Sequence, residues 1–238
     1  MFEENYKLKY ISDLSELREV FQKAHDHVKS QFKLYEDKKS HSFDHIVRVT
    51  NTCLNLAQKL EAHLDVLLLA SIFHDVGRPI EEINGRCHAE VSAEEADKFL
   101  DKLNLSKLKK DVNEAILSHR FSKKIEPRTI EAKILQDADA LDALGAIGLY
   151  RTISFSCERG LDMQEALIHF DEKLFKLPSR MHFPITKQIA ESKCIILKEF
   201  VKKIEEESSN SFFNIFLQQN DGKYLRKNKS PKKNFKYS

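Results

Sequence analysis

Histidine and aspartate side chains at four points of this chain have the order of a metal-binding set: His45, the adjacent pair His74 and Asp75, and Asp139. Imidazole nitrogens and carboxylate oxygens are common ligands of first-row divalent cations. Such a cation lowers the pKa of a bound water to about 7 and neutralises charge that builds up on a phosphoryl oxygen. Hydrolysis of a phosphate ester uses both effects, but these residues by themselves imply only a bound cation.

The pair His74 and Asp75 follows a nearly continuous apolar run over residues 66–73. Neighbouring residues of a helix point about 100° apart, so both can reach one ion only where the helix ends. Gly77 and Pro79 come next and predict that end. Taken alone, the pair would be better explained as a hydrogen-bonded core histidine and a capping aspartate.

The surroundings of His45 and Asp139 change that interpretation. Both lie in stretches with helical spacing of apolar residues. Four segments then occur in order: FDHIVRV, LLLASIFHDVGRP, CHAEVSAEEA and ILQDADALDALGAIG. With these motifs, residues 40–159 resemble the HD superfamily of metal-dependent phosphohydrolases, and look most like its members that act on nucleoside triphosphates. The resemblance favours metal binding by the pair over the structural alternative.

The resemblance implies one set of metal ligands: His45, His74, Asp75 and Asp139. Three aspartates compete for the last place, and a helix cannot turn all three toward one ion. Asp139 and Asp142 lie three residues apart and share a face, whereas Asp137 points about 200° away from Asp139. The family motif places the ligand at Asp139 with Asp142 beside it. Asp137 is then a solvated or capping carboxylate.

Two further histidines, His88 and His119, extend the set to the order His, His-Asp, His, His, Asp. In some HD proteins, histidines at comparable places complete a two-metal site, so the resemblance allows a second cation here. Hydrogen bonding to the other ligands, or contact with a phosphate, is an equal alternative. We expect His88 in the loop before a helix that begins near Glu90, and His119 near the end of the next helix.

A phosphorylated substrate also requires cationic side chains, and arginine offers a planar fork of donors that matches phosphate oxygens. Arg48 lies one helical turn from a ligand histidine, and Arg78 follows the glycine after the His-Asp pair, so both are expected near the metal. Arg151 is expected farther away. For each of the three, a plain surface ion pair is an equal alternative.

Two further roles have several candidates. The resemblance includes a Glu-Lys-Leu segment followed by Lys-Leu, from which a cation could reach over the site: Lys176, or in its place Lys173 or Arg180. An amphipathic helix and a surface loop explain this segment equally well. The candidate catalytic groups are Asp75, Asp142 and His119, the last two as proton carriers.

Composition and patterning predict an all-α protein with one domain over residues 1–206, and the resemblance implies that this domain is an HD-domain helical bundle. Of 238 residues, 41% are hydrophobic and 32% are charged, which suffices for one core with solvated helix faces. Glycine (6) and proline (5) are scarce. Asp65 is the expected N-cap of the third helix. Helices are expected over residues 14–35, 43–62, 65–76, 90–103, 107–120, 129–155 and 186–206, with a short helix between the last two.

The chain changes character after Glu206, where residues 207–238 are basic. We expect a flexible tail whose contact with nucleic acid is weak at most. The net charge of +2 excludes a polyelectrolyte role for the chain as a whole. Four scattered cysteines, the polar start and the lack of any apolar stretch near about 18 residues predict a cytoplasmic protein with reduced thiols and no membrane contact.

The function expected from the resemblance is hydrolysis of nucleotides or related small phosphate esters through a metal-activated water. The cofactor would be Mn²⁺, Co²⁺, Ni²⁺ or Mg²⁺. One alternative is an HD-type di-iron oxygenase, which uses redox-active iron and the same histidine order. Another is a non-catalytic regulatory module that retains a metal ion.

Overall fold

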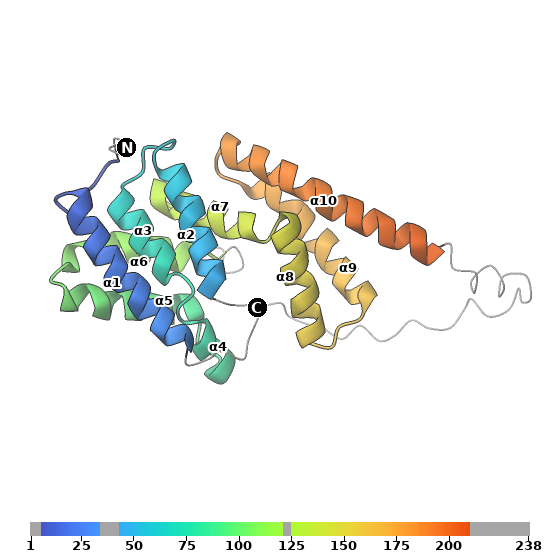
Figure 1. Cartoon of the computed structure of the whole chain (residues 1–238), viewed down its shortest axis with the longest axis horizontal. Coiled ribbons are helices and arrows are strands. Elements are labelled where there is room, and N and C mark those ends of the chain that lie inside the picture. Colours follow the sequence, from blue (N-terminus) through green and yellow to red (C-terminus); the bar gives the residue numbers. More distant parts are fainter. Residues whose placement is uncertain (1–5, 34–42, 121–124, 210–238) are drawn as a thin grey trace, which may run out of the picture.

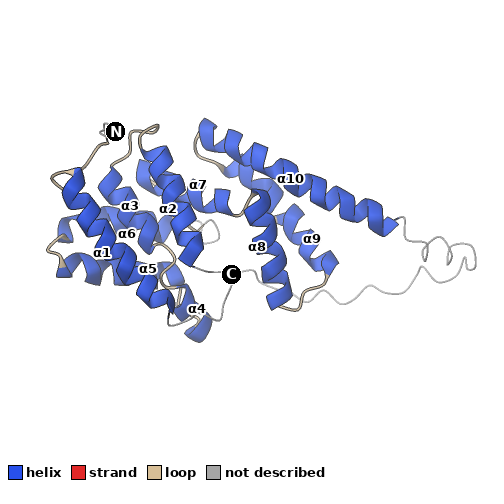
Figure 2. Ribbon diagram, viewed as in Figure 1, coloured by secondary structure: helices blue, strands red, loops and turns tan. Residues whose placement is uncertain are grey.

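The computed structural model describes residues 6–33, 43–120 and 125–209, and every regular element in these ranges is a helix (Figure 2). The predicted all-α fold is confirmed. None of the described helices is both long enough and apolar enough to cross a bilayer. In chain order the elements are α1 (Leu14–Lys33), α2 (Phe43–Ala57), α3 (Leu64–Phe73), α4 (Arg78–Asn84), α5 (His88–Lys102), η1 (Ser106–Leu108), α6 (Lys109–Ser118), α7 (Ile130–Asp142), α8 (Gly145–Glu158), α9 (Met163–Glu172), η3 (Leu174–Arg180) and α10 (Pro184–Ser209).

Helix α3 is the centre of the larger hydrophobic core (Figure 1). All of its residues are buried, because its sequence is apolar on nearly every side and such a helix must be covered all round. Helices α1, α2, α5, α6 and α7 pack against it. The end of α3, with the His74–Asp75 pair, is therefore enclosed by the surrounding helices.

A second, smaller core joins the end of α7 to η3 and to helices α9 and α10 (Figure 1). Helix α7 contributes to both cores: Leu135 and Ala138 face the first, and Leu141 faces the second. Because one rigid helix belongs to both, it fixes the C-terminal helices against the bundle. Most of the predicted basic tail, from residue 210 on, lies outside the described residues.

The predicted extension of the second helix to residue 62 is wrong, because α2 ends at Ala57. The chain turns into the left-handed region at Glu61, with φ of 55°. The Ala62 N–H then donates to the Ala57 carbonyl at 3.0 Å, which closes the helix end. Leu60 continues the helical spacing of apolar residues beyond this point, so the spacing alone does not indicate the turn.

The prediction of one helix over residues 129–155 is also wrong, since α7 and α8 are separate. Leu144 is extended (φ −117°, ψ 164°), and Gly145 has φ of 75°, a conformation that glycine adopts without strain. Apolar residues recur on both sides of this break, which is why their spacing predicts a continuous helix. The break changes the direction of the chain, so α8 packs against α10 and its Arg151 side chain reaches Asp142 at the end of α7.

The predicted N-cap at Asp65 is wrong as well, because His63 holds that position. The Asp65 carboxylate is fully buried and accepts the backbone N–H groups of Lys9, Tyr10 and Ile11 at 2.7–3.2 Å. These hydrogen bonds replace its lost hydration. Asp65 thereby ties the segment before α1 to the central helix.

Replacing Asp65 with alanine is expected to lower the free energy of unfolding by about 2–4 kcal/mol, because three partly buried N–H groups lose their acceptor. Urea unfolding followed by circular dichroism measures the change. The exposed Asp26 on α1 provides a control, since Asp26→Ala should leave the unfolding midpoint unchanged. Equal midpoints for Asp65→Ala and the unmodified protein would contradict this role.

Candidate metal centre

Five helices bring the predicted ligands to one place inside the bundle. His45 lies in the first turn of α2, and His74 and Asp75 directly follow α3. His88 begins α5, His119 directly follows α6, and Asp139 lies in the last turn of α7. His88 is the first residue of α5, so the prediction that it lies in a loop is wrong. Segments far apart in the sequence thus meet at the end of the buried helix α3.

These residues form two clusters of potential metal ligands, and within each cluster the ligand atoms lie within 4.8 Å of one another. One cluster comprises His45, His74 and Asp139, and the other comprises Asp75, His88 and His119. The adjacent residues His74 and Asp75 therefore belong to different clusters. Their divergence of about 100° along the helix is what separates them.

The Asp75 carboxylate lies between the two clusters. Its Oδ1 atom is 3.2 Å from Nε2 of His88 and 3.4 Å from Nε2 of His119. Its Oδ2 atom is 3.6 Å from Nε2 of His45 and 3.9 Å from Nε2 of His74. One carboxylate oxygen therefore faces each cluster, the geometry of a carboxylate that bridges two cations.

Each of the four histidines is held through Nδ1, which leaves Nε2 directed at the centre. Nδ1 of His74 lies 2.7 Å from the Ser71 carbonyl, and Nδ1 of His119 lies 2.6 Å from the Ile116 carbonyl. A carbonyl oxygen only accepts, so in both rings the hydrogen is on Nδ1 and the lone pair is on Nε2. Carboxylates hold the other two rings, with Asp142 at Nδ1 of His45 and Glu81 at Nδ1 of His88.

The Nε2 atoms face one another in pairs, and their spacing shows whether the residues fit a metal ion. Nε2 of His74 is 3.4 Å from Nε2 of His45, and Nε2 of His88 is 3.3 Å from Nε2 of His119. Two nitrogen ligands about 2.0–2.1 Å from a tetrahedral cation lie about 3.3 Å apart. The spacing and the donor atoms therefore both fit a divalent cation in each cluster.

Burial sets the protonation of these groups. Loss of hydration lowers the pKa of His74 to about 4 and that of His88 to about 3, so both rings are neutral at pH 7. Burial alone would raise the pKa of Asp139, but the hydrogen bond and charge of His45 hold it well below its usual range. Burial and the charge of Arg151 lower the pKa of His45, but its hydrogen bonds with Asp139 and Asp142 outweigh them and raise it, so a cation would displace a proton from this ring. Neutral imidazole and ionised carboxylate are the forms that bind metal ions.

Asp142 lies on the far side of His45 and not among the potential ligands. It accepts Nδ1–H of His45 at 2.8 Å, Nε–H of Arg48 at 2.7 Å and Nη1–H of Arg151 at 2.6 Å. Burial alone would raise its pKa, but these partners hold it far below its usual range. With both oxygens engaged, Asp142 is better placed to orient His45 than to carry a proton.

The prediction that Arg151 lies farther from the centre is wrong, because its Nη1 atom is 3.1 Å from Nδ1 of His45. The break before Gly145 turns α8 back and makes this contact possible. Arg48 and Arg78 lie at the centre as predicted, with Arg78 Nε 3.1 Å from Oδ1 of Asp75. All three arginines thus contact a ligand or the carboxylate that holds one.

Sequence reasoning missed Glu81 and Arg120. Glu81 accepts from Nδ1 of His88 at 2.6 Å, and Arg120 donates to Glu81 at 2.9 Å. Glu81 lies one helical turn after Arg78, with which it also pairs at 3.3 Å. A Glu one turn after an arginine is so common on exposed helices that its spacing gives no distinct signal.

Lys173, the alternative to the predicted Lys176, lies within electrostatic range of the centre. The charges of Asp139, Arg78 and Arg151 all act on Lys173, whose pKa lies below its usual value mainly because the surrounding groups displace water from it. Lys176 is exposed in η3, and its ammonium has no ion-pair or hydrogen-bond partner among the described residues.

Asp137 lies away from both clusters. It is fully buried and accepts the His182 N–H and the Thr186 hydroxyl, which lie at the start of α10. Of its two predicted roles, the capping carboxylate is therefore correct and the solvated carboxylate is wrong.

Gly77 permits the approach of α5 to the His74–Asp75 pair. A Cβ atom at this position would collide with the His88 carbonyl oxygen and the Val91 side chain. The Gly77 N–H also donates to the Ser92 hydroxyl at 2.9 Å. A larger residue here would separate His88 from Asp75.

The fold and its two clusters thus define an all-α protein with a buried centre suited to divalent cations.

Comparisons with known proteins find similarity to HD-domain proteins. The HD domain family matches residues 42–144. The uncharacterized protein YpgQ from Bacillus subtilis is 27% identical over 179 residues, which cover 73% of this chain and 87% of YpgQ. An HD-superfamily hydrolase from Bacillus thuringiensis has a similar crystal structure, with a TM-score of 0.64, 28% identity and coverage of 82% of this chain and 99% of that chain. The crystal structure of YpgQ in complex with ADP has a TM-score of 0.65 at 23% identity and covers 80% and 96% of the two chains. Residues 42–144 of this chain thus match the HD domain, and the chain is similar over most of its length to HD-superfamily hydrolases of known structure.

Replacing Asp142 with asparagine is expected to weaken Mn²⁺ binding about 10- to 100-fold, because the amide cannot accept from His45 and both arginines at once. Isothermal titration with MnCl₂ measures the affinity, and circular dichroism checks that helix content is retained. Asp171→Asn, at an exposed position of α9, is the matched control and should bind like the unmodified protein. Unchanged affinity in Asp142→Asn would contradict the orienting role.

Proposed function

We propose that this protein is a divalent-metal-dependent phosphohydrolase acting on nucleotides or related small phosphate esters. The observation that supports it most is the position of Asp75, with one oxygen facing each ligand cluster. Paired cation sites that share a ligand are typical of enzymes that hold a phosphate between two metals. Bound divalent cations would supply an activated water and neutralise charge on the phosphoryl oxygens.

The charges around the centre favour an anionic substrate. Four carboxylates, Asp75, Glu81, Asp139 and Asp142, are opposed by five cationic side chains: Arg48, Arg78, Arg120, Arg151 and Lys173. The centre is thus slightly positive before any divalent cation binds, and more so afterwards. A positive, partly enclosed surface raises the local concentration of phosphate groups.

The substrate would approach from the side of Asp139, whose side chain is 29% exposed, whereas that of Asp75 is 4% exposed. Arg151 contacts Asp142 through Nη1, so most of its five donors remain for a phosphate. Lys173 adds a second cation within electrostatic range of Asp139. Arg48, Arg78 and Arg120 are positioned chiefly to balance the buried carboxylates.

Support for a nucleotide comes from the relative YpgQ, which has been crystallised in complex with ADP. YpgQ is related to this chain over most of its length. The diphosphate of ADP carries negative charges of the kind that Arg151 and Lys173 would bind here. We therefore propose nucleoside phosphates as the first compounds to test.

The protein should be stripped of metal, reloaded singly with Mn²⁺, Co²⁺, Ni²⁺, Mg²⁺ or Fe²⁺, and assayed for phosphate and pyrophosphate release from a nucleotide panel, with oxygen uptake in parallel. We expect release with a redox-inert ion. His74→Ala and Asp75→Ala should abolish it and lose metal while keeping helix content, and Asp171→Ala, at an exposed position of α9, should not. Oxygen uptake with iron alone would indicate the oxygenase instead, and no turnover with any metal would indicate the binding module.

The number of metal ions tests the two-cluster geometry directly. The unmodified protein should retain two Mn²⁺ ions per chain after dialysis, and His88→Ala should retain one, because the cluster of His45, His74 and Asp139 remains intact. Atomic absorption gives the stoichiometry. A single ion in both proteins would show that His88 and His119 only form hydrogen bonds.

A further inference from the structure

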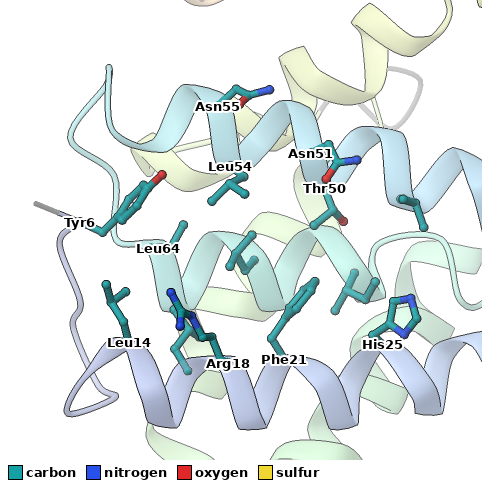
Figure 3. Close-up of a pocket in the computed structure, with 14 residues that line it drawn as sticks. Tyr6, Leu14, Arg18, Phe21, His25, Thr50, Asn51, Leu54, Asn55 and Leu64 are labelled. Carbon is teal, nitrogen blue, oxygen red and sulfur yellow. The ribbon is translucent and has the colours of Figure 1, made fainter. Parts of the chain in front are cut away.

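A separate cavity of about 660 Å³ lies between α1, α2 and α3 (Figure 3). This volume falls within the range of about 300–1,000 Å³ that is usual for small-molecule pockets. Along α1 the cavity extends from Leu14 to His25, a distance of about 16 Å at 1.5 Å per residue. It is therefore elongated and runs parallel to the helix.

The cavity is apolar along its length. Residues of α1 spaced by three and four positions form one wall, and residues of α3 spaced by four form the floor: Leu14, Leu17 and Phe21, and Leu64, Leu68 and Ile72. Leu54 points from α2 into the same space (Figure 3). An aliphatic chain laid along this surface would leave water over its whole length.

The edge of the cavity carries one permanent charge. Arg18 is exposed and rises from α1 toward the cavity beside Leu64 (Figure 3). Within the described ranges it has no carboxylate partner, and none of the fourteen lining residues is acidic. The charge of this cavity thus complements a single anionic group at one end of an apolar molecule.

The cavity is distinct from the metal centre, although both involve α2 and α3. Val47 lies two residues after His45, and Ile72 lies two residues before His74, so each points about 200° away from that ligand. No residue of either ligand cluster lines the cavity. Binding here can therefore be tested separately from catalysis.

We propose that this cavity binds a single-chain carboxylate amphiphile, such as a medium-chain fatty acid. The aliphatic chain lies on the apolar wall and floor, and the carboxylate lies at Arg18. The proposal does not rest on the proposed hydrolase activity.

The test is calorimetric titration of the full-length protein with dodecanoate, below the concentration at which it forms micelles, and with the uncharged dodecanol. We expect dodecanoate to bind more tightly than dodecanol. Arg18→Gln should weaken dodecanoate binding about tenfold and leave dodecanol binding unchanged. Lys23→Gln, at an exposed position of α1 outside the lining, should change neither.

A second pair of variants tests the location. Leu54→Trp should abolish binding of both ligands by filling the cavity. If Leu54→Trp loses helix content, Asn51→Trp at the exposed edge of the cavity replaces it as the test and should also block both ligands. Excess ADP should leave dodecanoate binding unchanged. The proposal is overturned if dodecanoate does not bind, or if neither tryptophan variant blocks its binding. It is also overturned if Arg18→Gln and Lys23→Gln weaken binding equally. Displacement of dodecanoate by ADP would show that it binds at the metal centre instead, and would likewise overturn the proposal.

Discussion

Imidazole Nε2 atoms that face one another across 3.3–3.4 Å are the feature on which the rest of this structure depends. Two nitrogens at that distance repel unless a proton or a cation lies between them. The arrangement persists in the fold because each ring is fixed from behind, by a carbonyl or a carboxylate at Nδ1. Asp75, placed between the pairs, supplies negative charge to both.

The cost of concentrating these polar groups is met by the packing around them. Helix α3 is apolar on nearly every side, so burial of its surface drives the end that carries His74 and Asp75 into the interior. The arginines then balance the buried carboxylates, because an uncompensated charge in such surroundings is strongly destabilising. The hydrophobic core and the ionic groups at the centre therefore depend on each other.

Local spacing predicted the helical class, and the resemblance to the HD superfamily predicted four of the six potential ligands, with His88 and His119 left between ligation and other roles. The sequence did not indicate the break before Gly145, since apolar spacing continues across it, and for that reason it misplaced Arg151. It also gave no signal for Glu81 or Arg120. Their roles arise from the packing of α4 and α6 beside α5, and their local sequence is that of ordinary surface charges.

What the sequence determined by itself was which side chains could bind a cation, because ligand chemistry is a property of residue type and the spacing of the His-Asp pair requires a helix end. The tertiary structure alone decided how these residues divide into two clusters and that Asp142 lies behind His45. It also decided that a separate apolar cavity opens on the opposite faces of the same helices. These outcomes depend on the directions in which helices cross, and those directions are fixed by contacts between residues far apart in the chain.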